Sequence, residues 1–142
     1  MSVDDPITGP GIGAYALRAM GDAGGLTQFG ANIERVRPGG RTSNRHWHSS
    51  EDEFAYVLEG NLILHENDGE HTLGPGDAVA WPAGVENAHT LENRSERDAY
   101  VLLVGTRAER DAVTYPDIDR VQIIDGDQSH FTRLDGTPLE KE

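Results

Sequence analysis

The sequence predicts an all-β domain, either a sandwich or a closed barrel. Short apolar or alternating runs recur about every ten residues, and clusters of Gly, Pro, Asn and Asp separate them, which is typical of strands joined by turns. A helical period is sustained nowhere long enough to predict a major helix. The 142 residues fit one domain with a core of its own.

The elements follow in chain order. A short helix is expected at residues 14–20, "AYALRAM", because "GDAGG" ends it at once. Strands are expected at 29–37, 45–49, 53–59, 61–66, 71–73, 78–81, 88–93 and 100–105. We therefore expect a barrel at 26–106 between short irregular extensions at 1–25 and 107–142. Residues 121–126, "VQIIDG", could add one more strand.

Composition limits the possible partners. The formal charge is −13, from 12 Lys and Arg against 25 Asp and Glu, so the surface should repel nucleic acids and anionic membranes. The chain has no cysteine, which suits a reducing compartment and restricts any metal ligands to nitrogen and oxygen. No targeting segment or membrane-length apolar run is visible in the sequence, so a cytoplasmic protein is expected.

The stretch "RHWHSSEDEF" holds the clearest candidate for a site. Side chains of a strand alternate between faces, so His46 and His48 point to one side and Trp47 to the other. After a turn at "SSED", Glu53 opens the next strand and can return to the same side. Two imidazoles and a carboxylate could bind a divalent ion, whereas the alternative is a polar barrel mouth without metal.

The spacing of these residues resembles the first motif of the cupin superfamily, G-x5-H-x-H-x(3,4)-E-x6-G. Gly40, His46, His48, Glu53 and Gly60 occupy its fixed positions. Asp52 could satisfy the shorter spacing from histidine to acid, but it misses the residue type and the distance to the last glycine. Glu53 is therefore the preferred carboxylate ligand.

The second cupin motif, G-x5-P-x-G-x2-H-x3-N, is matched with one displacement. Gly76, Pro82 and Gly84 lie on the pattern, but the expected histidine position holds Asn87. His89 stands two residues later, and a two-residue shift preserves the face of a strand. We expect His89 as the fourth ligand, although Asn87 shares its parity and could reach the cavity instead.

Longer stretches, including "DAGGLTQFGANIERVRPGG" and "PAGVENAHTLENRSERDAYVLLVGTR", resemble a bacterial family of small single-domain cupins with the same displaced histidine and no firmly assigned reaction. The resemblance implies a cupin barrel, also called a double-stranded β-helix or jelly roll. It also implies a divalent transition metal ion (Fe, Mn, Ni, Zn or Cu) held by His46, His48, Glu53 and His89. Because cupin barrels often pair through edge strands, we expect a homodimer.

Alternation sets expectations for the neighbouring side chains. Phe54, Tyr56 and Leu58 should face outward with Trp47, towards a second layer or a partner subunit. Inward positions should be Ala55, Val57 and Ile63, and Trp81 should be core or line the mouth. Arg45 should face outward, and Arg35 could face inward and hold an anionic substrate. The remaining histidines should lie on the surface: His65, His71 and His130.

Three functions are compatible with such a site. The first is a metal-dependent enzyme acting on a small polar or carboxylated metabolite, as a dioxygenase-type oxidoreductase or an isomerase. The apolar inward positions lean weakly towards dioxygenation, and no proton shuttle is apparent for isomerisation. The second is a non-catalytic protein that binds or senses a small molecule through its metal. The third is a structural metal that stiffens the barrel.

Overall fold

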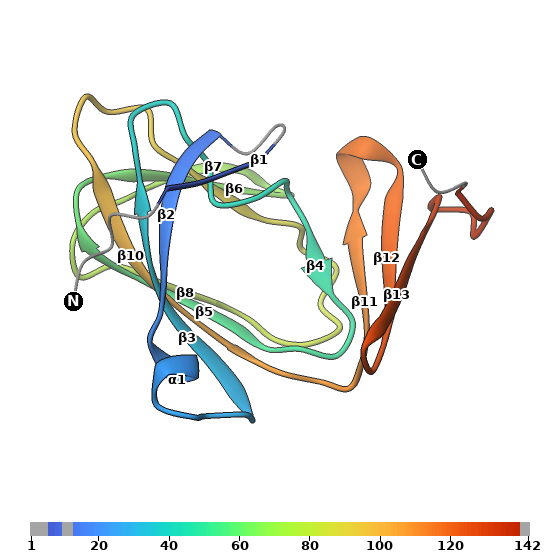
Figure 1. The fold of residues 1–142 in the computed structure, drawn as a ribbon. Helices are drawn as coiled ribbons and strands as arrows, with labels where there is room; N and C mark the ends of the chain where they lie inside the picture. The colour runs from blue at the N-terminus through green and yellow to red at the C-terminus, as the bar shows by residue number, and fades with distance from the viewer. Residues whose placement is uncertain (1–5, 10–12, 140–142) are drawn as a thin grey trace.

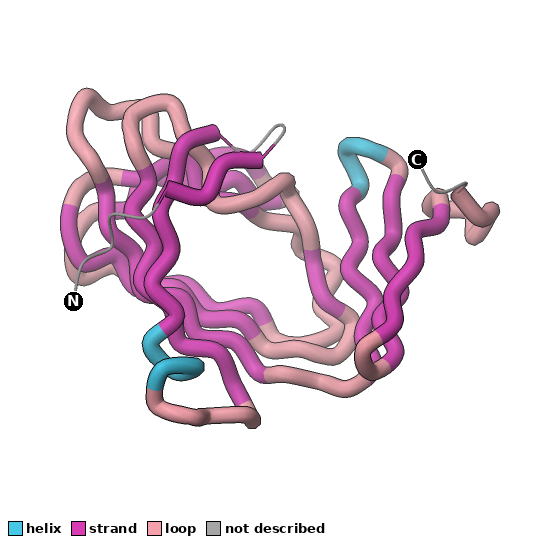
Figure 2. Tube along the Cα trace, in the orientation of Figure 1, coloured by secondary structure: helices cyan, strands magenta, loops and turns pink. Residues whose placement is uncertain are grey.

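The computed structural model describes residues 6–9 and 13–139. Figures 1 and 2 show a β barrel with a smaller sheet beside it. The helical elements are one turn of α-helix, α1 (Met20–Ala23), and one 3₁₀ turn, η1 (Pro116–Ile118). The strands are β1 (Pro6–Gly9), β2 (Gly13–Ala19), β3 (Phe29–Val36), β4 (Trp47–His48), β5 (Glu53–Glu59), β6 (Leu62–Glu66), β7 (Gly69–Leu73), β8 (Ala78–Trp81), β9 (Thr90–Glu92), β10 (Ala99–Thr106), β11 (Arg110–Tyr115), β12 (Arg120–Asp125) and β13 (Gln128–Thr132).

Three sheets make up the described chain. The largest has the strand order β1-β2-β3-β10-β5-β8, and a smaller one, β7-β6-β9, lies across the barrel from it (Figure 1). The third sheet, β13-β12-β11-β4, joins the C-terminal strands to the short strand that carries His48. A bridge between His46 and His89 ties this third sheet to the start of β9. The fold thereby brings segments forty residues apart to one end of the barrel.

The core lies inside the barrel, and strict alternation along β5 builds one wall of it. Ala55 and Val57 are buried, whereas Phe54, Tyr56 and Leu58 are exposed on the outer face, as expected. Trp81 is buried and belongs to the same core, which confirms its expected place. Ile63 was expected to face inward, but β6 buries Leu62 and Leu64, so Ile63 lies on its other face. The prediction of which residues of β6 face inward was therefore wrong by one position.

The jelly-roll barrel is confirmed, and the expected strands between residues 29 and 106 are all present with small shifts at their ends. The expected helix at 14–20 was wrong: β2 covers residues 13–19 and pairs with β3, so tertiary pairing outweighs the local helical pattern. An irregular extension was expected at residues 107–142, of which 140–142 lie outside the described residues. Residues 107–139 instead form β11, β12 and β13, of which only the middle strand had been anticipated.

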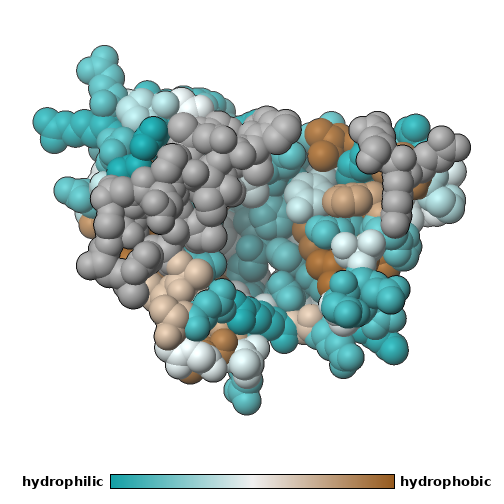
Figure 3. Space-filling view, viewed as in Figure 1, coloured by the Kyte–Doolittle hydropathy of each residue, from teal (hydrophilic) through white to brown (hydrophobic). Residues whose placement is uncertain are grey.

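One face of the molecule shows where polar and apolar residues gather. The face seen in Figure 3 is mostly hydrophilic, and apolar residues gather over the C-terminal strands at the right of the view. Within the described ranges, no helix is long and apolar enough to cross a membrane.

Candidate metal centre

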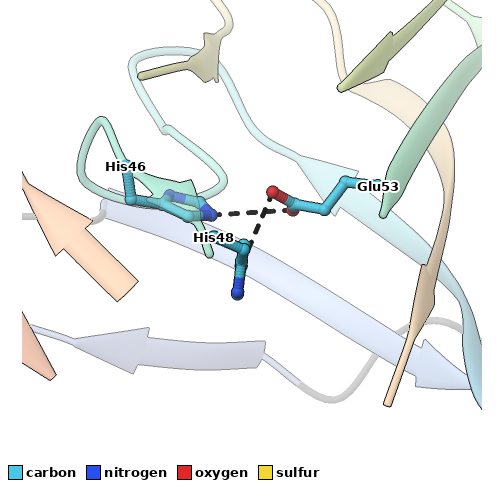
Figure 4. A group of neighbouring side chains, drawn as sticks. All are labelled: His46, His48 and Glu53. Carbon is cyan, nitrogen blue, oxygen red and sulfur yellow. Dashed lines mark ion pairs between the residues drawn. The ribbon is translucent and has the colours of Figure 1, made fainter. Parts of the chain in front are cut away.

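Two neighbouring segments bring the first three candidate ligands together. His46 and His48 flank Trp47 and share one face, and Glu53 opens β5 on the opposite side of the centre (Figure 4). His46 Nε2 lies 3.6 Å from Glu53 Oε2, and His48 Nε2 lies 3.5 Å from Glu53 Oε1. The ligand atoms of these three residues all lie within 4.8 Å of one another. Such a set can hold one metal ion.

His89 reaches the same carboxylate from the other strand. Its Nε2 lies 2.8 Å from Glu53 Oε1, although His89 is outside the set whose ligand atoms all lie within 4.8 Å. Backbone hydrogen bonds in both directions between His46 and His89 fix the two segments against each other. The Trp81 ring stacks on the His89 imidazole at 3.7 Å, which holds its orientation. The two-residue displacement therefore still brings this histidine to Glu53.

The outer ring nitrogens of all three histidines are engaged. Nδ1 of His46 lies 2.8 Å from the carbonyl oxygen of Asn44, and Nδ1 of His89 lies 2.9 Å from that of Asn87. Nδ1 of His48 lies 2.5 Å from Asp111 Oδ2. Each of these oxygens only accepts, so each Nδ1 carries a hydrogen, and each Nε2 is left facing the centre.

This arrangement requires positive charge at the centre. Three Nε2 lone pairs directed at the carboxylate of Glu53 would repel it, so protons or a metal ion must stand between them. Burial acts to raise the pKa of Glu53, but hydrogen bonds and charges from His46 and His89 outweigh it and hold that pKa well below its usual range. Burial acts to lower the pKa of His46, yet Glu53 raises it overall. The donor set thus fits a divalent cation, which would supply the same charge without protons.

Asp111 is a contributor that the sequence did not reveal. It is buried on β11, within the segment that was expected to be an irregular extension. Its Oδ1 accepts hydrogen bonds from Ser50 N and Ser49 Oγ, which leaves Oδ2 directed at His48. Glu51 Oε1 lies 3.5 Å from the same His48 nitrogen. The only available signal was the alternation in "RDAVTY", which places Asp111 and Val113 on one face.

Asp52 and Asn87, the alternatives to Glu53 and His89, point away from the metal centre. Asp52 Oδ1 accepts a hydrogen bond from Ala83 N in an exposed turn. Asn87 donates to Glu66 Oε2 and accepts from Asn67 N, so its amide is occupied away from the histidines. Neither side chain lines the cavity at the centre.

A cavity of about 320 Å³ opens beside the four candidate ligands. Its wall combines apolar side chains with polar ones from β3 and the loop before β4. Its lining includes Gly30, Asn32, Glu34, Thr42, Leu103 and Gly105. Arg35 does not line it, so the idea of an inward Arg35 is not supported; Glu34 takes that place. A volume of this size suits a small metabolite.

The other expected surface groups lie away from the centre. Arg45 faces outward and pairs with Asp117 at 2.8 Å, with a further contact to Asn67. His65 pairs with Glu92 and His71 with Asp68, both on the outside of the barrel. His130 lies exposed on β13. None of these residues lines the cavity.

The site's fold and spacing have counterparts among known proteins. The sequence model of a protein family described as the cupin domain matches residues 32–105, just over half of the chain. A crystal structure from Silicibacter pomeroyi, described as a sugar phosphate isomerase from a cupin superfamily, is 44% identical over 89% of this chain and 80% of that one, with a TM-score of 0.85. A crystal structure from Acidithiobacillus ferrooxidans, described as a putative sugar phosphate isomerase, is 26% identical over 91% and 82%, with a TM-score of 0.84.

More distant structures share the barrel with different described activities. The polyketide cyclase RemF from Streptomyces resistomycificus is 28% identical over 70% of each chain, with a TM-score of 0.59. No curated protein matches the chain. Two structures that are similar over most of this chain are thus described as sugar phosphate isomerases, while the barrel itself hosts several chemistries. The extent of the domain match and the 44% identity show that this chain belongs to the cupin domain family.

Proposed function

We propose that the protein is a metal-dependent enzyme that acts on a small polar or carboxylated metabolite in the barrel cavity, and that its reaction is an isomerisation. His46, His48, Glu53 and His89 would hold a divalent transition metal ion. Bound there, the ion would act as a Lewis acid towards a carbonyl or hydroxyl oxygen. The chain's own groups orient the ligands and line the space in which the substrate lies.

One observation carries the proposal: three imidazoles are fixed through Nδ1 and direct Nε2 at one carboxylate. A wet, polar barrel mouth has no need to fix three histidine rings in this way. The hydrogen bonds to Asn44 O, Asn87 O and Asp111 hold each ring in the tautomer that a metal ligand requires. Four protein ligands would leave one or two positions on a five- or six-coordinate ion for the substrate.

Two observations favour isomerisation over dioxygenation. Two of the compared structures are described as sugar phosphate isomerases, one of them 44% identical. The cavity wall also carries the polar side chains of Asn32, Glu34 and Thr42, whereas an apolar wall was the ground for expecting dioxygenation. A wall that mixes polar with apolar side chains can hold a substrate with several hydroxyl groups.

Proton exchange tests the reaction class. The metal-reconstituted protein would be incubated with a panel of aldoses, ketoses and their phosphates in D₂O and followed by proton NMR, with dissolved oxygen recorded in parallel. If the reaction is an isomerisation, an aldose and its ketose should interconvert without oxygen uptake, and the Glu53→Ala variant should lose this activity. Oxygen consumption with an oxidised product would instead establish the dioxygenase.

The alternative is a non-catalytic protein that binds a small molecule through its metal. It predicts a stoichiometric, slowly released ligand and no product from any substrate of the panel. A purely structural metal predicts a third outcome, in which Glu53→Ala or a chelator unfolds the domain. Thermal unfolding of the variant, recorded beside the NMR assay, separates this case from loss of activity alone.

A further inference from the structure

Glu34 faces the interior of the barrel. It pairs with Val101 on β10, and Val101 pairs in turn with Val57 on β5. Residues directly opposed in an antiparallel ladder point to the same face, and both valines are fully buried in the core. The side chain of Glu34 therefore points inward, and it lines the same cavity as the candidate metal ligands.

The sheet register separates Glu34 from the metal centre along the barrel. Gly105 of β10 pairs with Gly30 and with Glu53, whereas Val101 pairs with Glu34. Gly105 lies four positions beyond Val101, which corresponds to roughly 13 Å of strand. The two carboxyl groups thus approach the cavity from opposite ends, and each side chain extends into it.

The wall between these two carboxyl groups leaves room for a ligand. The row that contains Glu53 continues with Gly105 and Gly30, which have no side chains, and the next row contains Asn32 and Leu103. All four of these residues line the cavity. The Arg107 guanidinium also lines the cavity, with Nη2 3.5 Å from where a Cβ of Gly30 would lie. A chain-like molecule between the metal centre and Glu34 would therefore lie beside this guanidinium.

Glu34 lacks the partners that a buried carboxyl normally has. Glu34 is only 9% exposed, and no group of the described residues forms a hydrogen bond with its Oε2. Burying a polar group without a partner is costly, and such groups cluster where a ligand completes the hydrogen bonding. At the metal centre, by contrast, the Glu53 carboxylate contacts His46, His48 and His89.

We propose that Glu34 forms the far subsite of the substrate cavity, and that the substrate is an elongated polyhydroxylated molecule. One end would chelate the metal through an α-hydroxy carboxylate or α-hydroxy carbonyl group, and a hydroxyl group of the tail would hydrogen-bond Glu34. This inference rests on the proposed function, since it needs the metal centre as the near subsite.

The protonation behaviour of Glu34 suits a hydroxyl partner. Burial raises the pKa of Glu34 to about 7, so both forms are present near neutral pH. A hydroxyl group can donate to the carboxylate or exchange hydrogen bonds with the neutral carboxyl, whereas a phosphate or carboxylate there would be repelled by the ionised form. An anionic group of the substrate is therefore expected at the metal end or the cavity mouth.

Calorimetric titration of the Mn²⁺-loaded protein with glycolate and with D-gluconate tests the subsite. Both ligands offer the same α-hydroxy carboxylate, but only gluconate carries a hydroxylated tail. Wild-type protein should bind gluconate roughly tenfold or more tightly than glycolate, because the tail satisfies a buried group. Glu34→Leu should abolish this difference and leave glycolate binding unchanged. Glu34→Gln, which keeps hydrogen-bonding capacity, should retain most of it.

Glu59→Gln is the matched control, since Glu59 is an exposed carboxylate on β5 outside the cavity. Equal affinity of the wild-type protein for the two ligands, or gluconate binding that survives Glu34→Leu, would overturn the inference. An equal loss of glycolate and gluconate binding in Glu34→Leu would overturn it as well. Metal content is measured before titration, and if the protein takes up no Mn²⁺ the titrations use whichever of Fe, Ni, Cu and Zn it retains. Retention of none of these metals would overturn the proposed function, and the inference with it.

Discussion

Asp111 determines how His48 can serve as a ligand. Its Oδ2 lies 2.5 Å from His48 Nδ1 and fixes the ring so that Nε2 faces Glu53. Asp111→Asn keeps the shape of the side chain but removes its charge. We expect the variant to remain folded and to lose roughly ten- to a hundredfold in metal affinity, measured by competition with a chelating dye. Asp125→Asn, an exposed carboxylate at the end of β12, is the control; an equal effect there would contradict the assignment.

Glu34 should make stability depend on pH. Its pKa is raised by burial from 4.5 to about 7, so from about pH 4.5 upward the unfolded chain ionises before the folded one does. The folded state is then disfavoured progressively until about pH 7, by a total of about 3 kcal/mol, and the loss levels off above that. Below pH 4.5 the carboxyl is neutral in both states and contributes no difference.

Urea unfolding of wild-type protein and Glu34→Gln across this range measures the effect. The variant's advantage in unfolding free energy should grow as the pH rises from 4.5 to 7. The difference between the two proteins cancels the contributions of all ionisable groups that both of them contain. A difference that stays constant with pH would show that Glu34 is not held in an apolar environment.

At the scale of the elements, the turn between β5 and β6 depends on a glycine at position 60. Its φ of +82° is left-handed, and a Cβ added there would lie 2.8 Å from Ala99 Cα and from Asp98 O. Gly39 has nearly the same φ, +83°, but a Cβ there would meet nothing within 4 Å. We expect Gly60→Ala to destabilise the protein by at least ~1 kcal/mol more than Gly39→Ala. Equal melting temperatures for the two variants would contradict the crowding at the turn.

Elements with clean alternation could be predicted from sequence, and β5 is the clearest case. A period of two predicted which residues of β5 face outward and which face inward. The same period placed His46, His48 and Glu53 on one side. β2 was mistaken for a helix because "AYALRAM" has local helical character, and only its pairing with β3 makes it a strand. Asp111 and Glu34 were missed for a related reason. Their relation to the histidines depends on sheet register between distant strands, which no local pattern contains.

At the scale of the whole molecule, we expect a homodimer, which remains a prediction. The outer face of β5 exposes Phe54, Tyr56 and Leu58, and Phe29 is exposed nearby in the same sheet. Contiguous apolar side chains of this kind typically mark an interface. Light scattering at micromolar concentration should give twice the monomer mass, and the double variant Tyr56→Glu, Leu58→Glu should give a monomer. Val85→Glu, an exposed apolar loop position, is the control. A monomeric wild-type protein would contradict the prediction.

The proposed function requires a metal ion at His46, His48, Glu53 and His89. Metal content of the protein, purified without a histidine tag and measured by mass spectrometry, tests this most directly. After reconstitution with Mn, Fe, Ni, Cu and Zn in turn, at least one metal should be retained at about one ion per chain and lost in a folded Glu53→Ala variant. Substoichiometric metal with every one of these ions would show that these four residues do not form a metal centre.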